Sequence, residues 1–243
     1  MSEILGKSLW FAVDAVKDKI TVPLVDENLF YETVLKSDCV FNEVVPNQLD
    51  DIRRDFDKMT SDQKHKAMKL VIFCSQMTEI WQISYSFSSF GPLVVTFLET
   101  ATTLPSKRLA YLCLLSLLQR CNTEIAYLSV NSIIKDISGR VPEVIVMALN
   151  AAGNIKDVDL LPVILPAVEK RLTYPDVNVR CQVFRTLHFL LKNSPLQSFD
   201  EYERHMRLAL SDKSPHVMAI SLPYLDVILE VSYFLSFSPP QPF

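Results

Sequence analysis

One helical pattern occurs three times in the second half of the chain. Each copy has an apolar helical run, a short polar link with a proline, and a second apolar run that opens on a valine. The first runs end at Ile137, Leu172 and Leu210, and the valines seven residues later are Val144, Val179 and Val217. The valines lie 35 and 38 residues apart. This is the period of a repeat made of paired helices.

The second helix of each pair carries the same apolar face. Its members are Val144, Leu149, Ala152 and Ile155 in the first copy, Val179, Phe184, Leu187 and Leu190 in the second, and Val217, Leu222, Leu225 and Ile228 in the third. Such faces pack one helix pair on the next. We therefore predict an all-α fold, an α-solenoid of HEAT/armadillo-like helix pairs, whose usual function is to hold partners.

Composition supports helices and opposes sheets. The chain has only four glycines and fourteen prolines. Few glycines are available for tight β-hairpins, whereas prolines are numerous enough to mark links between helices. Gly91 and Pro92 are expected to mark a helix start, with the glycine in a left-handed turn. Pro166 and Pro223 fall inside predicted helices, which should bend there or begin later. Helices are predicted over residues 48–58, 61–84, 92–101, 106–119, 123–137, 142–154, 158–172, 177–192, 199–210 and 215–235.

The chain is predicted to have three parts. Residues 1–46 form an irregular N-terminal leader, residues 47–235 form the solenoid, and residues 236–243 form a non-helical tail rich in proline. The last helix keeps an apolar face without a polar capping repeat. Because an open solenoid end exposes such a face, we expect the isolated chain to associate, and we expect a partner or more chain to cover it.

Charge and cysteine usage exclude several classes of function. The net charge is −4 and no run of lysine or arginine exceeds two residues, which argues against nucleic acid as the main ligand. Five scattered cysteines without a CxxC pair exclude a zinc ribbon or a disulfide framework and favour a reducing compartment. The N-terminal residues lack the pattern of a signal or transit peptide. We expect a cytoplasmic protein that reaches membranes as a peripheral partner.

No motif for catalysis or cofactor binding is present. The glycines are isolated, so no phosphate-binding loop occurs, and the four histidines form neither HExxH nor HxxxH. His188 is expected to pack rather than to bind metal, and Cys74 and Cys113 are expected to be buried, inert thiols. We predict no cofactor, no metal site and no enzymatic activity. A helical hydrolase that uses a cysteine or a carboxylate pair is the alternative.

Several segments resemble the opening of the adaptin large-subunit trunk. Residues 48–53 (QLDDIR), 69–74 (KLVIFC) and 88–91 (SSFG) come first. Residues 107–112 (KRLAYL), 130–136 (VNSIIKD) and 148–155 (ALNAAGNI) follow, and they are similar to the family stretches KR-x-GYL, N-[ST]-[IV]-x-[KN]-D-[LI] and AL-x-x-x-G-N-I. The resemblance covers residues 47–231, with Ala110 in place of the usual glycine. Residues 161–172 and 217–225 look most like the epsilon subunit of the fourth adaptor-protein complex.

This resemblance implies a subunit of a heterotetrameric coat adaptor. Its partners would be beta-type large, medium and small adaptor chains and an Arf-type GTPase, and its work would be cargo sorting in vesicle-mediated protein transport at the trans-Golgi network. The epsilon-type complex is thought of as working without clathrin. A gamma- or alpha-type adaptin of a clathrin adaptor, or a HEAT-repeat scaffold outside adaptor complexes, is the alternative.

Five positions match the family pattern: Arg53, Lys107, Arg108, Lys135 and Asp136. Lys135 and Asp136, at a predicted helix end, are suited to tying adjacent repeats together by side-chain hydrogen bonds. Other basic doublets, such as Lys170 with Arg171, are either solvated helix surface or contacts for anionic lipid headgroups. The leader departs from the family's usual basic leader, and the hinge and appendage are not in this sequence. We therefore expect a short or truncated trunk without direct phosphoinositide contact through its leader.

Overall fold

The computed structural model describes residues 46, 49–80, 86–120, 122–193 and 199–237. No strand occurs in these ranges. Residues 49–55 are helical and lead into the 3-10 turn η1 (Phe56–Lys58). The helices that follow are α4 (Ser61–Ile80), α5 (Gly91–Thr100), α6 (Leu104–Leu118), α7 (Asn122–Ile137), α8 (Pro142–Gly153), α9 (Leu161–Glu169), α10 (Val177–Asn193), α11 (Phe199–Leu210) and α12 (Pro215–Phe237).

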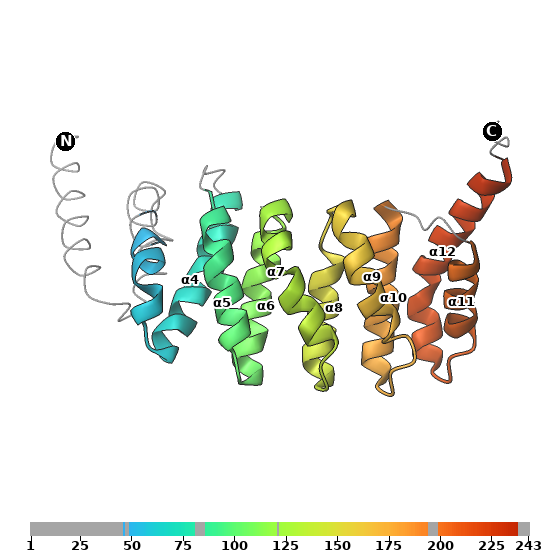
Figure 1. The fold of residues 1–243 in the computed structure, drawn as a ribbon, viewed down its shortest axis with the longest axis horizontal. Coiled ribbons are helices and arrows are strands. Elements are labelled where there is room, and N and C mark those ends of the chain that lie inside the picture. Colours follow the sequence, from blue (N-terminus) through green and yellow to red (C-terminus); the bar gives the residue numbers. More distant parts are fainter. Residues whose placement is uncertain (1–45, 47–48, 81–85, 121, 194–198, 238–243) are drawn as a thin grey trace, which may run out of the picture.

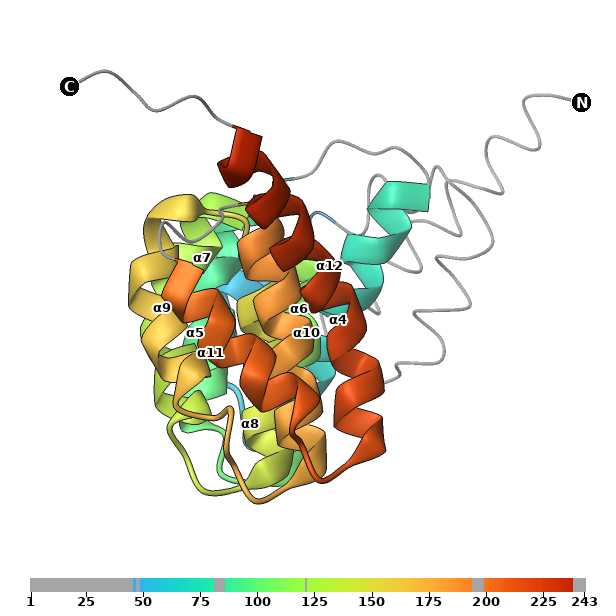
Figure 2. The same cartoon turned by 90° about the vertical axis from the view of Figure 1, so that its right-hand side faces the viewer.

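The helices stack in two layers along one axis. Helices α5, α7, α9 and α11 form one layer, and α4, α6, α8, α10 and α12 form the other (Figures 1 and 2). Within a layer, α10 packs on α8 and α12, while α7 packs on α5 and α9. The pairs α5/α6, α7/α8, α9/α10 and α11/α12 therefore repeat one arrangement, with one helix in each layer. This arrangement confirms the predicted all-α solenoid.

The connections within each pair all lie at one edge of the array, the lower edge in Figure 1. They are residues 101–103, 138–141, 170–176 and 211–214. We call this the link edge. The prediction that proline marks these links is confirmed, because α8 begins at Pro142 and α12 at Pro215. Proline suits the first turn of a helix, where its missing N–H has no helical partner to lose.

Side-chain caps fix two further helix starts at the link edge. Asp176 Oδ1 accepts hydrogen bonds from the backbone N–H groups of Asn178 at 2.8 Å and Val179 at 3.1 Å, ahead of α10. Thr103 caps α6 by accepting from the N–H of Ser106 at 3.3 Å. Such caps satisfy amide donors that a helix leaves open at its N-terminus.

Two predicted elements differ from the structure. The helix expected over residues 158–172 starts only at Leu161, after the 3-10 turn η3 (Val158–Leu160), and ends at Glu169. Gly91 is not left-handed, since its φ is −49° and its ψ is −55°. A Cβ at Gly91 would lie 3.2 Å from both Ile125 and Leu128. The glycine is therefore suited to the close approach of α7 rather than to a turn.

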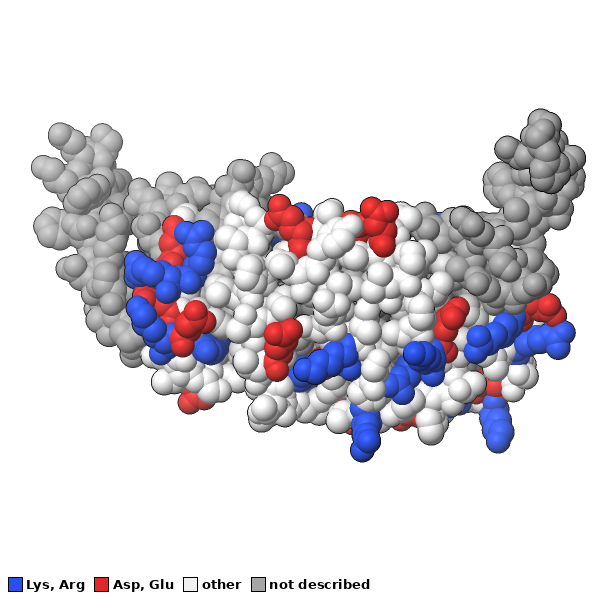
Figure 3. Space-filling model, viewed as in Figure 1, with Lys and Arg blue, Asp and Glu red and all other residues white. Residues whose placement is uncertain are grey.

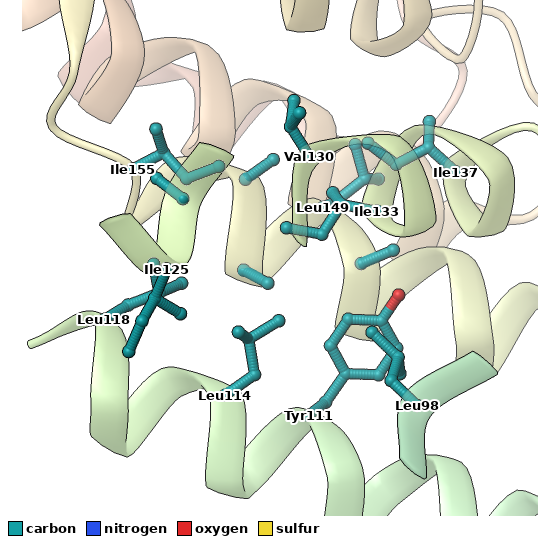
Figure 4. Packing of buried hydrophobic residues seen from close by; sticks show 14 of the residues in the cluster. Leu98, Tyr111, Leu114, Leu118, Ile125, Val130, Ile133, Ile137, Leu149 and Ile155 are labelled. Atoms are coloured by element: carbon teal, nitrogen blue, oxygen red, sulfur yellow. The ribbon is translucent and has the colours of Figure 1, made fainter. Parts of the chain in front are cut away.

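The core lies between the two layers. Figure 4 shows Tyr111, Leu114 and Leu118 of α6 pointing toward Ile133 of α7 and Leu149 of α8. All five are buried. At roughly 25 cal/mol per Å² of apolar surface, a large side chain buried this fully contributes about 1.5–3 kcal/mol. The contacts cross from one pair to the next, so stability accumulates along the array.

The repeated apolar face was predicted correctly for two copies and wrongly for one position of the third. Leu149 and Phe184 are buried, whereas their counterpart Leu222 is 56% exposed. Phe184 of α10 faces the next helix of its layer, since it packs on the Tyr224 ring of α12 at 6.1 Å. Among the described residues no helix follows α12, so the same position faces outward there.

Some predictions concern residues outside the described ranges. Apart from Pro46, the predicted leader of residues 1–46 lies outside them, as do residues 81–84 of the predicted helix 61–84. Helix α12 continues through Phe237, two residues beyond the predicted end. The remaining predicted tail, residues 238–243, also lies outside.

Candidate functional site

Asp136 joins two consecutive helix pairs. Its Oδ2 atom accepts from Lys107 Nζ at 2.7 Å and from the Tyr111 hydroxyl at 2.8 Å. Lys107 and Tyr111 lie on α6, while Asp136 lies at the end of α7. Burial, followed by the negative charge of Asp136, raises the pKa of Tyr111, so the phenol stays protonated and keeps donating. Two of the five family-pattern residues, Lys107 and Asp136, thus meet as an ion pair between repeats.

Arg171 ties the third link (residues 170–176) to the second (residues 138–141). Its Nε donates to the Ile137 carbonyl at 2.8 Å and one terminal nitrogen donates to the Gly139 carbonyl at 3.0 Å. Tyr174 adds a hydroxyl bond of 3.2 Å to the Arg140 carbonyl, and the guanidinium lies 5.2 Å from the Tyr174 ring centre. The bond to Ile137 satisfies a carbonyl that the end of α7 leaves without a helical partner. The other two bonds hold carbonyls of the link that follows α7.

Arg180 ties the third link (residues 170–176) to the fourth (residues 211–214). It forms a two-pronged pair with Asp212, at 2.7 Å and 2.9 Å, and its other terminal nitrogen donates to the carbonyls of Tyr174 and Pro175. The hydrogen bond from Arg180 is the largest of the effects that lower the pKa of Asp212. A fork-to-carboxylate pair is geometrically specific and is stronger than a neutral hydrogen bond.

A buried histidine joins three helices of the last two pairs. His205 of α11 is 1% exposed, with Nε2 3.0 Å from Glu169 of α9 and Nδ1 2.6 Å from the Tyr224 hydroxyl of α12. Burial raises the pKa of Glu169, and nearby Arg204 opposes that shift. The histidine therefore acts as a polar connector in the interior.

The other three family-pattern residues are on the surface. Arg53 forms an exposed pair with Asp50 at 3.3 Å, while Arg108 and Lys135 are exposed. The structure does not bring these three together with Lys107 and Asp136 as one cluster. Sequence reasoning missed Arg180, Asp212 and His205, and it treated Arg171 only as half of a basic doublet. A signal was available, because Arg171 follows Asp136 by 35 residues, which is one repeat.

The cysteines and the histidine singled out in the sequence are inert or hydrogen-bonded. Burial raises the pKa of Cys74 and of Cys113 to about 12, so both thiols stay protonated at neutral pH. His188 Nδ1 donates to the Pro223 carbonyl at 3.0 Å. No group of three metal-binding side chains gathers among the described residues.

Comparison with known proteins identifies the family. The family model for the adaptin N terminal region matches residues 42–233. The chain belongs to the adaptin family. The match runs through the described helices and ends at Tyr233, four residues before the end of α12. The family model and the two-layer array therefore cover the same segment. The match confirms the resemblance found in the sequence.

Several curated adaptins are similar to this chain. AP-4 complex subunit epsilon-1 of Mus musculus is 26% identical over 201 residues, or 82% of this chain and 17% of that protein. AP-4 complex subunit epsilon-1 of Homo sapiens is 31% identical over 146 residues, or 60% of this chain and 13% of that protein. AP-3 complex subunit beta of Eremothecium gossypii is 33% identical over 101 residues, or 42% and 13% respectively. The chain thus spans less than a fifth of the length of these relatives.

A search of the helices in the described ranges found none that is long and apolar enough to cross a membrane.

Proposed function

We propose that this chain is a non-enzymatic scaffold that works as a large subunit, or as the opening trunk of one, in a heterotetrameric adaptor coat complex. The observation that carries the proposal is the adaptin match over residues 42–233, which coincides with the tied two-layer solenoid. Solenoids present extended surfaces to partners. The epsilon type is favoured because two AP-4 epsilon-1 relatives match 82% and 60% of the chain.

The proposed partners are a beta-type large chain, a medium chain and a small chain, with an Arf-type GTPase for recruitment. The proposed site of action is the cytoplasmic face of trans-Golgi network or vesicle membranes, where the complex would sort cargo as a peripheral coat. Within the chain, we propose that Lys107 and Asp136 hold neighbouring repeats at a fixed angle, so that the partner surface keeps its shape. Arg53, Arg108 and Lys135 would be surface positions of that scaffold.

Two other proposals fit the same fold. The AP-1 complex subunit gamma-2 of Arabidopsis thaliana is 28% identical over 137 residues, so a gamma- or alpha-type role in a clathrin adaptor is one. A HEAT-repeat scaffold outside adaptor complexes is the other. The identity of the copurifying chains separates all three.

The test is affinity purification of the tagged chain from its native cells, followed by mass spectrometry. An epsilon-type subunit is expected to recover the beta-type, medium and small chains of the fourth adaptor-protein complex. Recovery of clathrin-adaptor chains instead would support the gamma or alpha type, and recovery of no adaptor chain would overturn the proposal. Leu149→Pro is the control bait, because a proline inside α8 breaks the array. Partners that persist with this variant bind an unfolded chain and are discounted.

A further inference from the structure

The outward sides of α7 and α9 carry the same pattern of exposed residues. An exposed carboxylate comes first, at Glu124 in the first turn of α7 and at Asp159 just before α9. An exposed lysine comes last, at Lys135 in the last turn of α7 and at Lys170 just after α9. We call the two carboxylates the acidic border and the two lysines the basic border. Members of each border lie 35 residues apart, which is one repeat.

The exposed apolar residues between the two borders repeat with the same period. Leu128 is 47% exposed and Val163, which lies 35 residues later, is 50% exposed. Tyr127, Pro162 and Pro166 are exposed beside them. We call these five residues the α7/α9 patch. Packing of the array requires its buried positions to repeat, but it does not account for an exposed apolar pattern that repeats as well.

The two halves of the α7/α9 patch are adjacent, because α7 packs on α9 within one layer. Figure 3 views this layer from outside and shows carboxylates along its upper border, basic side chains along its lower half, and a broad uncharged area between them. An exposed apolar area with a polar rim is typical of a surface that binds another protein.

The acidic border lies close to the apolar residues. Desolvation, followed by the carboxylates of Asp157 and Asp159, raises the pKa of Tyr127. The Tyr127 phenol therefore stays protonated beside two negative charges. Asp157 also accepts a hydrogen bond from the N–H of Asp159 at 3.0 Å, which holds this short segment ahead of α9. This side of the patch would repel an acidic partner and attract a basic one.

The distance between the borders matches the width of one helix. Glu124 and Lys135 are 11 residues apart on α7. At a rise of about 1.5 Å per residue, their Cα atoms are separated by about 16 Å along the helix axis. A helix with its side chains is about 10–12 Å across, so its two flanks would reach both borders. A single extended strand is narrower and would leave one border without a partner.

We propose that the α7/α9 patch is the docking site for an amphipathic helix of a partner protein. The helix lies along the array, with its apolar residues on Leu128 and Val163. One flank carries lysine or arginine and faces the acidic border, and the other carries aspartate or glutamate and faces the basic border. This inference deepens the proposed scaffold function and rests on it for its setting.

The test is fluorescence anisotropy with the full chain and a synthetic amphipathic peptide of about five helical turns. The peptide has a leucine stripe, with lysines on one flank and glutamates on the other. The control peptide has the same composition, but lysines and glutamates are mixed on both flanks. Since mixed flanks cannot complement the two borders, the control peptide is expected to bind at least about fivefold more weakly.

Removal of the apolar contacts is the first test on the chain. L128S/V163S is expected to weaken binding of the peptide with separated flanks by about tenfold, because two contacts with leucine are lost. The matched control is L112S/F189S, which changes side chains that are 52% and 55% exposed on α6 and α10 of the other layer. It is expected to bind within about twofold of wild type. Circular dichroism checks that both variants keep wild-type helicity.

Charge reversal is the second test, and it includes a rescue. E124K/D159K makes both borders basic and is expected to weaken binding by about tenfold. Adding K135E/K170E makes the former basic border acidic. Binding is expected to return to within about twofold of wild type, because a helix that is turned end for end exchanges its flanks. Damage to the fold would not be repaired by two further surface substitutions.

Three results would overturn the proposal: equal binding of the two peptides, equal losses in L128S/V163S and L112S/F189S, or no recovery in the fourfold charge variant. If L128S/V163S abolishes self-association in light scattering and leaves peptide binding unchanged, the patch is a contact between copies and the proposal is wrong. Peptide binding that passes these tests while copurification recovers no adaptor chain would sink the adaptor role and leave the docking site in place.

Discussion

At the scale of single residues, hydrogen bonds and ion pairs between repeats fix how neighbouring helix pairs are placed. Asp136, Arg171 and Arg180 each reach across a repeat boundary from a helix end or a link, and His205 does so from the middle of α11. A buried or half-buried charge needs such partners, because leaving one unpaired costs more than an ordinary hydrogen bond contributes. These contacts therefore restrict how one helix pair can be placed relative to the next.

Asp136→Ala should destabilise the fold by about 2–4 kcal/mol, because the Tyr111 hydroxyl and Lys107 ammonium both lose their acceptor in a poorly solvated place. Urea denaturation followed by circular dichroism measures the change in the free energy of unfolding. Glu203→Ala is the control, since it removes an exposed pair with Arg207 and should leave the midpoint unchanged. Similar midpoints for the two variants would show that the Asp136 tie contributes little.

Asp212 should make stability depend on pH in the acid range. Its pKa is lowered in the folded protein, first by Arg180, so the unfolded chain binds more protons in that range. Its stabilising contribution is complete above the unfolded pKa of about 3.9 and is lost as pH falls through the folded pKa. The difference in unfolding free energy between wild type and Asp212→Asn should be constant near neutrality and should shrink below about pH 4. A constant difference down to strongly acidic pH would contradict this assignment.

At the scale of helices, the period and the proline links predicted most of what the structure shows. The starts of α8, α10 and α12 and both ends of α11 coincide with the predicted ones. The sequence pattern gave a wrong prediction where burial depends on tertiary packing. Leu222 has the sequence of a core position, yet burial depends on a neighbouring helix that periodicity cannot supply.

The candidate site was harder to predict than the helices. Asp136 was recognised as a tie because it ends a helix, but its partner Tyr111 is 25 residues away and looks like an ordinary core aromatic. Arg180 and Asp212 lie 32 residues apart. Such pairs meet only after the links stack, so residue type and local spacing do not reveal them.

Two glycines offer a matched test of helix packing. Gly91→Ala should destabilise the protein by about 1 kcal/mol, because the new Cβ would press on buried Ile125 and on Leu128. Gly153→Ala should be neutral or should stabilise by up to about 1 kcal/mol, because its Cβ would meet Thr186 and Phe189 at ordinary contact distances. Thermal unfolding of both variants measures the difference. The packing account fails if Gly91→Ala is the more stable of the two.

At the scale of the whole molecule, no helix in the described ranges covers the outer face of α12. Leu222 and Leu229 on that helix are 56% and 60% exposed. Inner helices of the same layer bury the corresponding face against a neighbour. The purified chain should therefore associate as its concentration rises, because contact between copies removes this apolar surface from water.

Light scattering over a range of concentrations measures this association. Leu222→Ser combined with Leu229→Ser should keep the chain monomeric to higher concentration than wild type. Val163→Ser, which changes another half-exposed residue on α9, should leave the association unchanged. A wild-type chain that stays monomeric at the highest concentration would count against an adhesive α12 face.

The ties at the link edge also have a mechanical consequence. Arg171 and Arg180 join successive links through six hydrogen bonds to backbone carbonyls and a carboxylate on one side of the array. When the array flexes, this side should resist a change in length. The length of the array should therefore stay nearly constant along the link edge. Curvature would then change by spreading or closing the opposite side, and spacing along the tied edge would stay constant.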